Sequence, residues 1–214
     1  LPPLVQRSAK QSPLAELSVA AAQVLHSSKI APVVLIMVGV GFCFIGEFSV
    51  IIPIMVRDNY AGGSTGLALI NIAFVFGLIS ATLTLRRLPP IKYQGRAIFS
   101  ACCGGALLTA LFGLAPPLPL FYLFIYLFGI GAGITMSIGR TIVQKAASPA
   151  HRAQVLAIYS LTFLGSAPIG SFAIGQIAAA AGVTMASYIT AGVMAALLLG
   201  VITLSGVWRV QRET

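Results

Sequence analysis

Acidic residues, histidines and cysteines are scarce in this chain. Its 214 residues include four Asp or Glu, two His and three Cys, and charged residues make up only 8%. An ordinary soluble domain carries about 25% charged residues. No phosphate-binding loop, zinc motif, Ser-His-Asp set or dinucleotide fingerprint is present. We therefore predict that the chain is not an enzyme and that it binds neither a cofactor nor a metal ion.

Long apolar runs make up most of the chain. Hydrophobic residues make up 58% of the chain, and the mean hydropathy is +0.98. Six runs of about 18–28 residues are each long enough to cross a hydrocarbon core of about 30 Å at 1.5 Å per helical residue. They lie near 30–56, 66–85, 97–115, 118–139, 154–181 and 184–207. The pattern predicts an all-α membrane protein with six transmembrane helices.

The thirteen Lys and Arg residues alternate between the gaps of this pattern. From the N-terminus to the C-terminus, the segments outside the runs hold 3, 1, 4, 0, 3, 0 and 2 of them. Because basic residues mark cytoplasmic loops, both ends of the chain and the loops 86–96 and 140–153 are predicted to be cytoplasmic. The net charge of +9 is explained by this orientation, so we expect the lipid surface, and not nucleic acid, to be the partner of these cations.

The two ends of the chain differ from its centre. Residues 1–29 are predicted to form a cytoplasmic linker with a short amphipathic helix that starts at Pro13, although a simple linker with nascent helix remains the alternative. The transmembrane domain is predicted at 30–208 and a cytoplasmic tail at 209–214. The first residue is Leu1 and not Met, so we expect a piece of a longer protein.

Small residues are dense within two of the runs. They allow close approach between helices, because lipid supplies no hydrophobic drive for helix association. Pro168 should bend its helix, since it removes one backbone hydrogen bond. Close packing with some bending is the favoured interpretation, and a flexing gate is the alternative. The packing or gating positions are Gly129, Gly133, Gly165, Pro168, Gly170 and Gly175. The aromatic run 121–128 passes all round its helix, which favours contact with lipid and the interface.

Glu47 is the residue that departs most from the apolar pattern. It lies ten positions before Arg57, about 15 Å from that helix end, and so near the middle of the membrane. An ionisable group at this depth is costly and usually faces a bundle interior or a cavity. Either it carries a proton or contacts a cationic substrate in a central cavity, or it is a neutral carboxyl that hydrogen-bonds a neighbouring helix.

Four further polar residues are candidates for contact with a substrate. Arg140 lies at the end of the fourth run, where its side chain can reach the inner surface, and binding an anionic substrate or pairing with an acid is the alternative. Asn71 in the second run is expected to hydrogen-bond a neighbouring helix, with substrate contact as the alternative. Tyr159 and Gln176 are polar positions on the fifth run.

Several segments resemble major facilitator superfamily transporters, in particular the branch that exports drugs and siderophores. The sequence Arg140-Thr141-Ile142-Val143-Gln144, followed by 149–155, is similar to the loop between helices 10 and 11 of that branch. The stripe 163–175 resembles its helix 11, and 53–66 resembles the end of helix 7 with its loop. The resemblance covers nearly the whole chain from residue 14 onward.

The resemblance implies the C-terminal six-helix half of a twelve-helix secondary transporter. A small-molecule substrate would lie between this half and an N-terminal six-helix half, and efflux across a bacterial inner membrane is the expected direction. The chain departs from the family at Arg140, where the family has Asn, and at Ala150 and Ala153, where it has Asp and Gly. A six-span scaffold or accessory subunit that transports nothing is the alternative function. The substrate, the direction of transport, the coupling to protons and the oligomeric state are not determined by the sequence.

Overall fold

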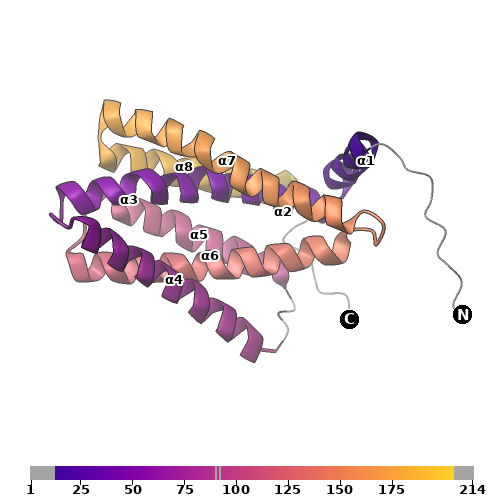
Figure 1. The fold of residues 1–214 in the computed structure, drawn as a ribbon, viewed down its shortest axis with the longest axis horizontal. Helices are drawn as coiled ribbons and strands as arrows, with labels where there is room; N and C mark the ends of the chain where they lie inside the picture. Colours follow the sequence, from indigo (N-terminus) through magenta and orange to yellow (C-terminus); the bar gives the residue numbers. More distant parts are fainter. Residues whose placement is uncertain (1–12, 90, 92, 205–214) are drawn as a thin grey trace, which may run out of the picture.

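The chain folds into a bundle of long helices, as Figure 1 shows. This computed structural model describes residues 13–89, 91 and 93–204, and none of these lies in a β-strand. Its elements are α1 (Pro13–His26), α2 (Ile30–Gly39), the π-helical segment η1 (Val40–Ile45), α3 (Gly46–Asp58), α4 (Ser64–Arg87), α5 (Gln94–Phe112), α6 (Leu118–Ala146), α7 (Arg152–Ala181) and α8 (Val183–Leu204). The predicted all-α class is confirmed.

Six helical stretches in the described residues are long and apolar enough to cross a membrane. The first is the continuous helix Ile30–Asp58, made of α2, η1 and α3, and the others are α4, α5, α6, α7 and Val183–Thr203 of α8. Each corresponds to one of the apolar runs in the sequence. The six apolar helices make this a multi-pass membrane protein.

Short turns join the spans at one end of the bundle. Residues 59–63 and 113–117 form two of them, and Gly182 alone separates α7 from α8. Gly182 has a φ of 87°, a conformation that glycine adopts without steric cost. The hydroxyl of Tyr60 donates to the carbonyl of Pro116, which ties two of these turns together. Burial raises the pKa of the Tyr60 phenol.

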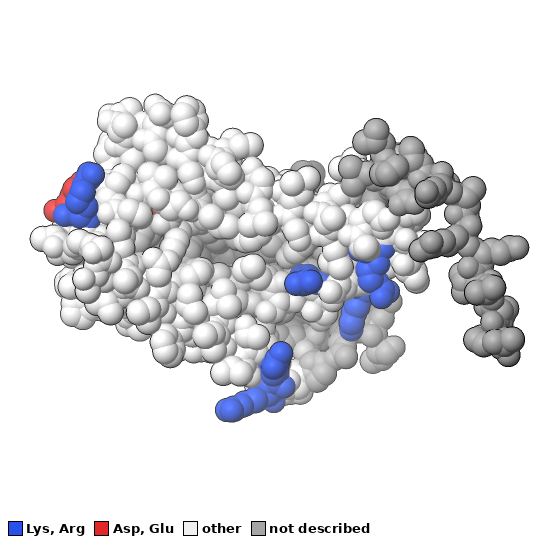
Figure 2. All heavy atoms as spheres, viewed as in Figure 1, with Lys and Arg blue, Asp and Glu red and all other residues white. Residues whose placement is uncertain are grey.

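The charges of the described residues gather at the opposite end. Seven of their eight Lys and Arg residues lie where α2, α5 and α7 begin and where α4 and α6 end. The exception is Arg57, whose Nε lies 2.6 Å from Oδ1 of Asp58. Figure 2 shows this pair at one end, with the other visible cations spread toward the far end. The asymmetry is the one that the positive-inside rule uses to orient a membrane protein.

Glycines set the closest helix contacts. A Cβ atom on Gly129 would overlap the backbone of Phe74 in α4, and one on Gly133 would meet Ala81 and Leu78. On α7, a Cβ on Gly170 would overlap the backbone of Phe42 in η1. Gly175 has only a loose contact with Val50, and a Cβ on Gly165 would meet no atom within 4 Å. Of these three glycines of α7, only Gly170 is in tight contact, so they do not form one packed stripe.

The aromatic run on α6 has a buried face. Phe121 and Ile125 are fully buried and Phe128 is 6% exposed, whereas Leu123 and Leu127 are exposed. Positions 121, 125 and 128 follow the three-to-four spacing of one helix face, so their side chains enter the core. The predicted contact with lipid all round this helix is wrong for these three residues, because a single face of α6 packs against α4 and α5.

The N-terminal helix α1 forms where the sequence predicts one, and it packs against α7 and α2. Val24 is buried, while Leu25 is 75% exposed. Ser148 donates from its hydroxyl to Oε1 of Gln23 at 3.3 Å, which joins α1 to the loop before α7. The linker before Pro13 and the predicted tail 209–214 lie outside the described residues.

Candidate functional site

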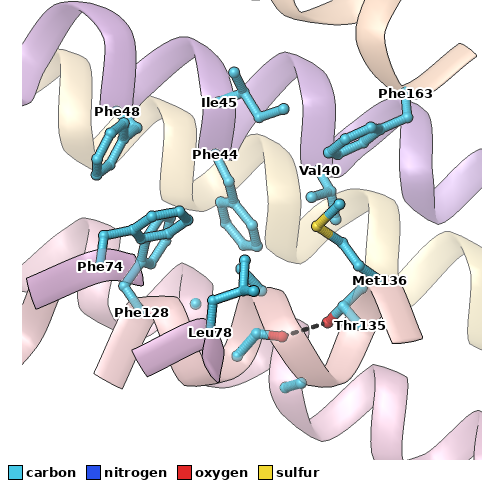
Figure 3. A pocket seen from close by; sticks show the side chains of 14 residues that line it. Val40, Phe44, Ile45, Phe48, Phe74, Leu78, Phe128, Thr135, Met136 and Phe163 are labelled. Atoms are coloured by element: carbon cyan, nitrogen blue, oxygen red, sulfur yellow. Dashed lines mark hydrogen bonds between the residues drawn. The ribbon is translucent and has the colours of Figure 1, made fainter. Parts of the chain in front are cut away.

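A groove with two parts is lined by the first span, α4, α5, α6 and α7. The first part is a cavity of about 300 Å³ whose lining is almost wholly apolar. Figure 3 shows its aromatic rings and Met136 arranged around the space, with the first span contributing Phe44 and Phe48. Its lining comprises Val40, Phe44, Ile45, Phe48, Phe74, Leu78, Ala101, Gly105, Phe128, Gly131, Ala132, Thr135, Met136 and Phe163.

The rings of this first part are packed against each other. The Phe44 and Phe128 centroids are 5.3 Å apart with planes at 71°, and those of Phe48 and Phe74 are 4.7 Å apart. Such edge-to-face and tilted arrangements are favourable for aromatic pairs. The Thr135 hydroxyl donates to the Gly131 carbonyl at 2.8 Å, as the dashed line in Figure 3 marks. This polar group is therefore satisfied within its own helix and leaves the cavity apolar in character.

The second part of the groove is polar. It has a volume of about 380 Å³ and is lined by Leu78, Thr82, Gly133, Met136, Ser137, Arg140, Tyr159, Ser160, Phe163 and Leu164. Leu78, Met136 and Phe163 line both parts, so the two are contiguous. Arg140 lies six residues before the end of α6, which places the polar part toward the cation-rich end of the bundle.

Arg140 and Tyr159, both candidates from the sequence, meet in this second part. Tyr159 is 7% exposed, and its ring lies close enough to Arg140 for the two to interact electrostatically. The Arg140 side chain is exposed, and it has no carboxylate partner among the described side chains. An uncompensated guanidinium of this kind is a ready donor to an anion.

Glu47 lies elsewhere, in the interior of the bundle. Its side chain is 1% exposed, and it lines neither part of the groove. The hydroxyls of Thr109 on α5 and Ser187 on α8 face the carboxyl. The expectation that Glu47 faces a central cavity therefore differs from its position here, because the first turn of α3 points this side chain toward α5 and α8.

The three polar groups of this interior cluster share an unusual property. No oxygen of the Glu47 carboxyl, of Thr109 or of Ser187 makes a hydrogen bond of regular geometry, although the two hydroxyls lie near enough to the carboxyl to interact with it. Other buried hydroxyls in the spans bond to their own helix, as Thr135 does to Gly131 and Thr190 does to Ala186. The hydroxyls of Thr109 and Ser187 do not make that bond to their own helix, and they face the Glu47 carboxyl instead. Buried polar atoms without partners are rare and mark sites of function or strain.

The remaining candidates occupy exposed positions. The Asn71 amide donates to the Leu67 carbonyl at 2.9 Å, so it bonds its own helix and not the neighbour that we expected. Its spacing from Phe74 and Leu78 nevertheless puts it on the groove side of α4. Gln176 is exposed on α7, and Pro168 lies inside α7, which continues through it without a break.

Sequence reasoning missed most of the apolar part of the groove. Phenylalanines are frequent in membrane spans, so nothing in the sequence separates Phe44, Phe74 and Phe163 from aromatic residues that face lipid. The spacing of Phe121, Ile125 and Phe128 was the available signal for a buried face of α6. Among the described residues, no group of three or more His, Cys, Asp or Glu could hold a metal ion.

Comparison with known families gives one match. A family model described as transmembrane secretion effector matches residues 5–211. The chain belongs to this family, which is part of the major facilitator superfamily. The resemblance noted in the sequence is thereby confirmed, and this family points to a transporter and not to an enzyme. No curated protein and no solved structure matches the chain.

Proposed function

We propose that this chain is the C-terminal half of a secondary active transporter that exports a small molecule by alternating access. The observation that carries the proposal is the groove on α4, α6 and α7, which lies in a bundle of the transmembrane secretion effector family. Substrate sites of such transporters lie between two six-helix halves. Ligand sites are mostly apolar with a few polar groups, and a groove with an apolar and a polar part fits one wall of such a site.

The partner that this proposal requires is an N-terminal six-helix half. Large apolar side chains at the groove are exposed, among them Leu161 at 71% and Leu164 at 62%. In a membrane these surfaces contact either lipid or another helical domain. A second half that covers the groove would close the substrate site, and the rocking of one half against the other would open it to each side in turn.

The orientation follows from the cations. In our proposal the protein lies in the bacterial inner membrane, with both termini and the end of the bundle that carries Arg86, Arg87 and Arg152 in the cytoplasm. Reporter fusions at Gly63 and Lys92 test it. Gly63 should report the outer side and Lys92 the cytoplasm, and the reverse result at either position contradicts the six-span topology.

The coupling is proposed to be antiport, with Glu47 as the candidate proton carrier. It is buried at mid-membrane depth, and no described cation pairs with it. A carboxyl in such surroundings can change its protonation when water or a neighbouring helix moves. Since Glu47 does not line the groove, protonation would act on the substrate site through the helix that carries both Glu47 and Phe48.

Transport by the complete protein tests this function. Everted membrane vesicles that contain it should accumulate substrate from a panel of fluorescent small molecules, and a proton uncoupler should abolish the accumulation. Vesicles without the protein provide the control. If no compound in a chemically broad panel is moved while the protein is folded and inserted, the chain serves instead as a six-span scaffold or accessory subunit.

A further inference from the structure

The two parts of the groove differ in chemistry and lie side by side. Leu78, Met136 and Phe163 belong to both, and they mark the boundary between the aromatic part and the polar part. Five phenylalanines line the aromatic part: Phe44, Phe48, Phe74, Phe128 and Phe163. A ligand that filled the whole groove would have to be apolar along one portion and polar at one end.

The charge of the groove lining determines which polar group of a ligand can bind there. Among the residues that the structure describes, Arg140 is the only charged one that lines either part of the groove. The hydroxyl groups of Thr82, Ser137, Tyr159 and Ser160 surround the same space. Thr82 donates to the Leu78 carbonyl at 2.9 Å within its own helix. The acid that could attract a cation, Glu47, is buried away from the groove among Thr109 and Ser187.

We propose that this groove selects amphiphilic organic anions, with the apolar or aromatic body among the phenylalanines and the anionic group on the Arg140 guanidinium. This substrate class rests on the proposed transport function. A guanidinium offers a planar fork of donors that matches a carboxylate in a two-point contact. The hydroxyls of Tyr159 and Ser160 add donors beside it. A cationic ligand of the same shape meets repulsion from Arg140 and finds no acid in the groove.

Position along the membrane supports the assignment. Arg140 lies at the cation-rich end of the bundle, which the proposed orientation places in the cytoplasm. An anion arriving from the cytoplasm meets the guanidinium first, and its apolar body then enters the aromatic part. The exposed side chain of Arg140 is consistent with this access, since a guanidinium committed to an internal ion pair would be buried beside its acid.

A matched pair of probes tests the proposal: 1-pyrenebutyrate and its neutral amide. They share a flat aromatic body and differ in one charge. Transport of each is measured in everted vesicles that contain the complete protein, as wild type and as the variants Arg140→Gln and Arg140→Lys. Arg87→Gln removes a cation at the same end of the bundle that does not line the groove, and it serves as the control.

We expect wild type to transport the carboxylate in preference to the amide. Arg140→Gln should lower carboxylate transport by roughly 10–100-fold, the range expected for loss of a charge-assisted hydrogen bond, and leave amide transport within about twofold. Arg140→Lys should retain part of the preference, because it keeps the charge without the fork. Arg87→Gln should behave as wild type for both probes.

Two results would overturn the proposal while leaving the transport function intact. One is wild-type transport that favours the amide or a cationic pyrene analogue. The other is an equal loss of both probes in Arg140→Gln, which would assign Arg140 to packing or to an ion pair with the other half. The wild-type preference needs no variant, so it decides the question even where Arg140→Gln fails to fold. If wild type transports no compound of any charge, the proposed function itself fails.

Discussion

Two sides of this bundle surround a charged residue in opposite ways. The open side carries the groove, and the closed side is the packed interior next to α5 and α8. On the open side, Arg140 is exposed in a groove between α4, α6 and α7. On the closed side, Glu47 is 1% exposed, and the hydroxyls of Thr109 and Ser187 face it. Both residues interrupt apolar spans, and the sequence ranks the acid as the stronger candidate for substrate contact. The structure places Arg140 in the groove and Glu47 outside it, because the helix face, and not depth in the membrane, decides which side chains line a groove.

The closest contact between α7 and η1 is at Gly170, which touches the backbone of Phe42. A substitution that breaks this contact should have the largest effect on assembly of the bundle. Gly170→Leu would force a side chain into the backbone of Phe42, so we expect the protein to lose assembly or to be degraded. Gly165→Leu is the matched control, since a Cβ there meets no atom within 4 Å. Recovery of monodisperse protein in detergent measures both. Equal recovery of the two variants would show that the α7–η1 contact is not tight.

Glu47→Gln tests whether Glu47, on the closed side, has a role in transport besides its role in the fold. Gln keeps most of the hydrogen-bonding capacity but cannot ionise. If Glu47 carries a proton, we expect transport to fall by about tenfold or more with normal folding, in the range typical of a lost proton-transfer group, and the pH dependence of the remainder to flatten. Transport across pH in vesicles is the measurement. Wild-type rates with an unchanged pH profile would leave Glu47 as a structural residue.

Phe163→Ala sharpens the comparison on the open side. This residue lines both parts of the groove and is half-buried, so its loss should affect ligand contact as well as packing. We expect the concentration for half-maximal transport to rise by roughly 5–20-fold, as for one lost aromatic contact of about 1–2 kcal/mol. An effect confined to thermal stability would instead place Phe163 in the packing of α7.

The smallest expected effect is that of Tyr159→Phe. The ring is buried at 7% exposure, and Phe preserves its packing. Only the hydroxyl beside Arg140 is lost, so we expect carboxylate transport to fall by no more than about fivefold and amide transport to stay the same, in keeping with the modest net value of one neutral hydrogen bond. An equal fall for the two probes would separate Tyr159 from the anionic group.

The sequence predicts the helices of this protein far better than it predicts their faces. Hydropathy locates all six spans because each must bury about 20 apolar residues in lipid. The same apolar bias hides which face is which, so Phe128, Ile125 and Phe121 were expected to contact lipid although they point inward. Arg140 was recognised as a candidate because a charge stands out against such a background. The hydroxyls of Thr109 and Ser187 were not, since most hydroxyls in membrane helices bond to their own backbone.

The π-helical turn before Glu47 fixes the rotational phase of the first span. An α-helix advances about 100° per residue, so the extra residue that a π turn accommodates rotates everything after it by that angle relative to everything before it. Val40 and Phe44 lie in η1 and line the groove, and Phe48 continues that lining on α3, while its neighbour Glu47 points to α5 and α8. If the π turn relaxed into regular α-helix, Glu47 and Phe48 would rotate together about the helix axis. One motion would then change the direction of both the acid and the aromatic lining.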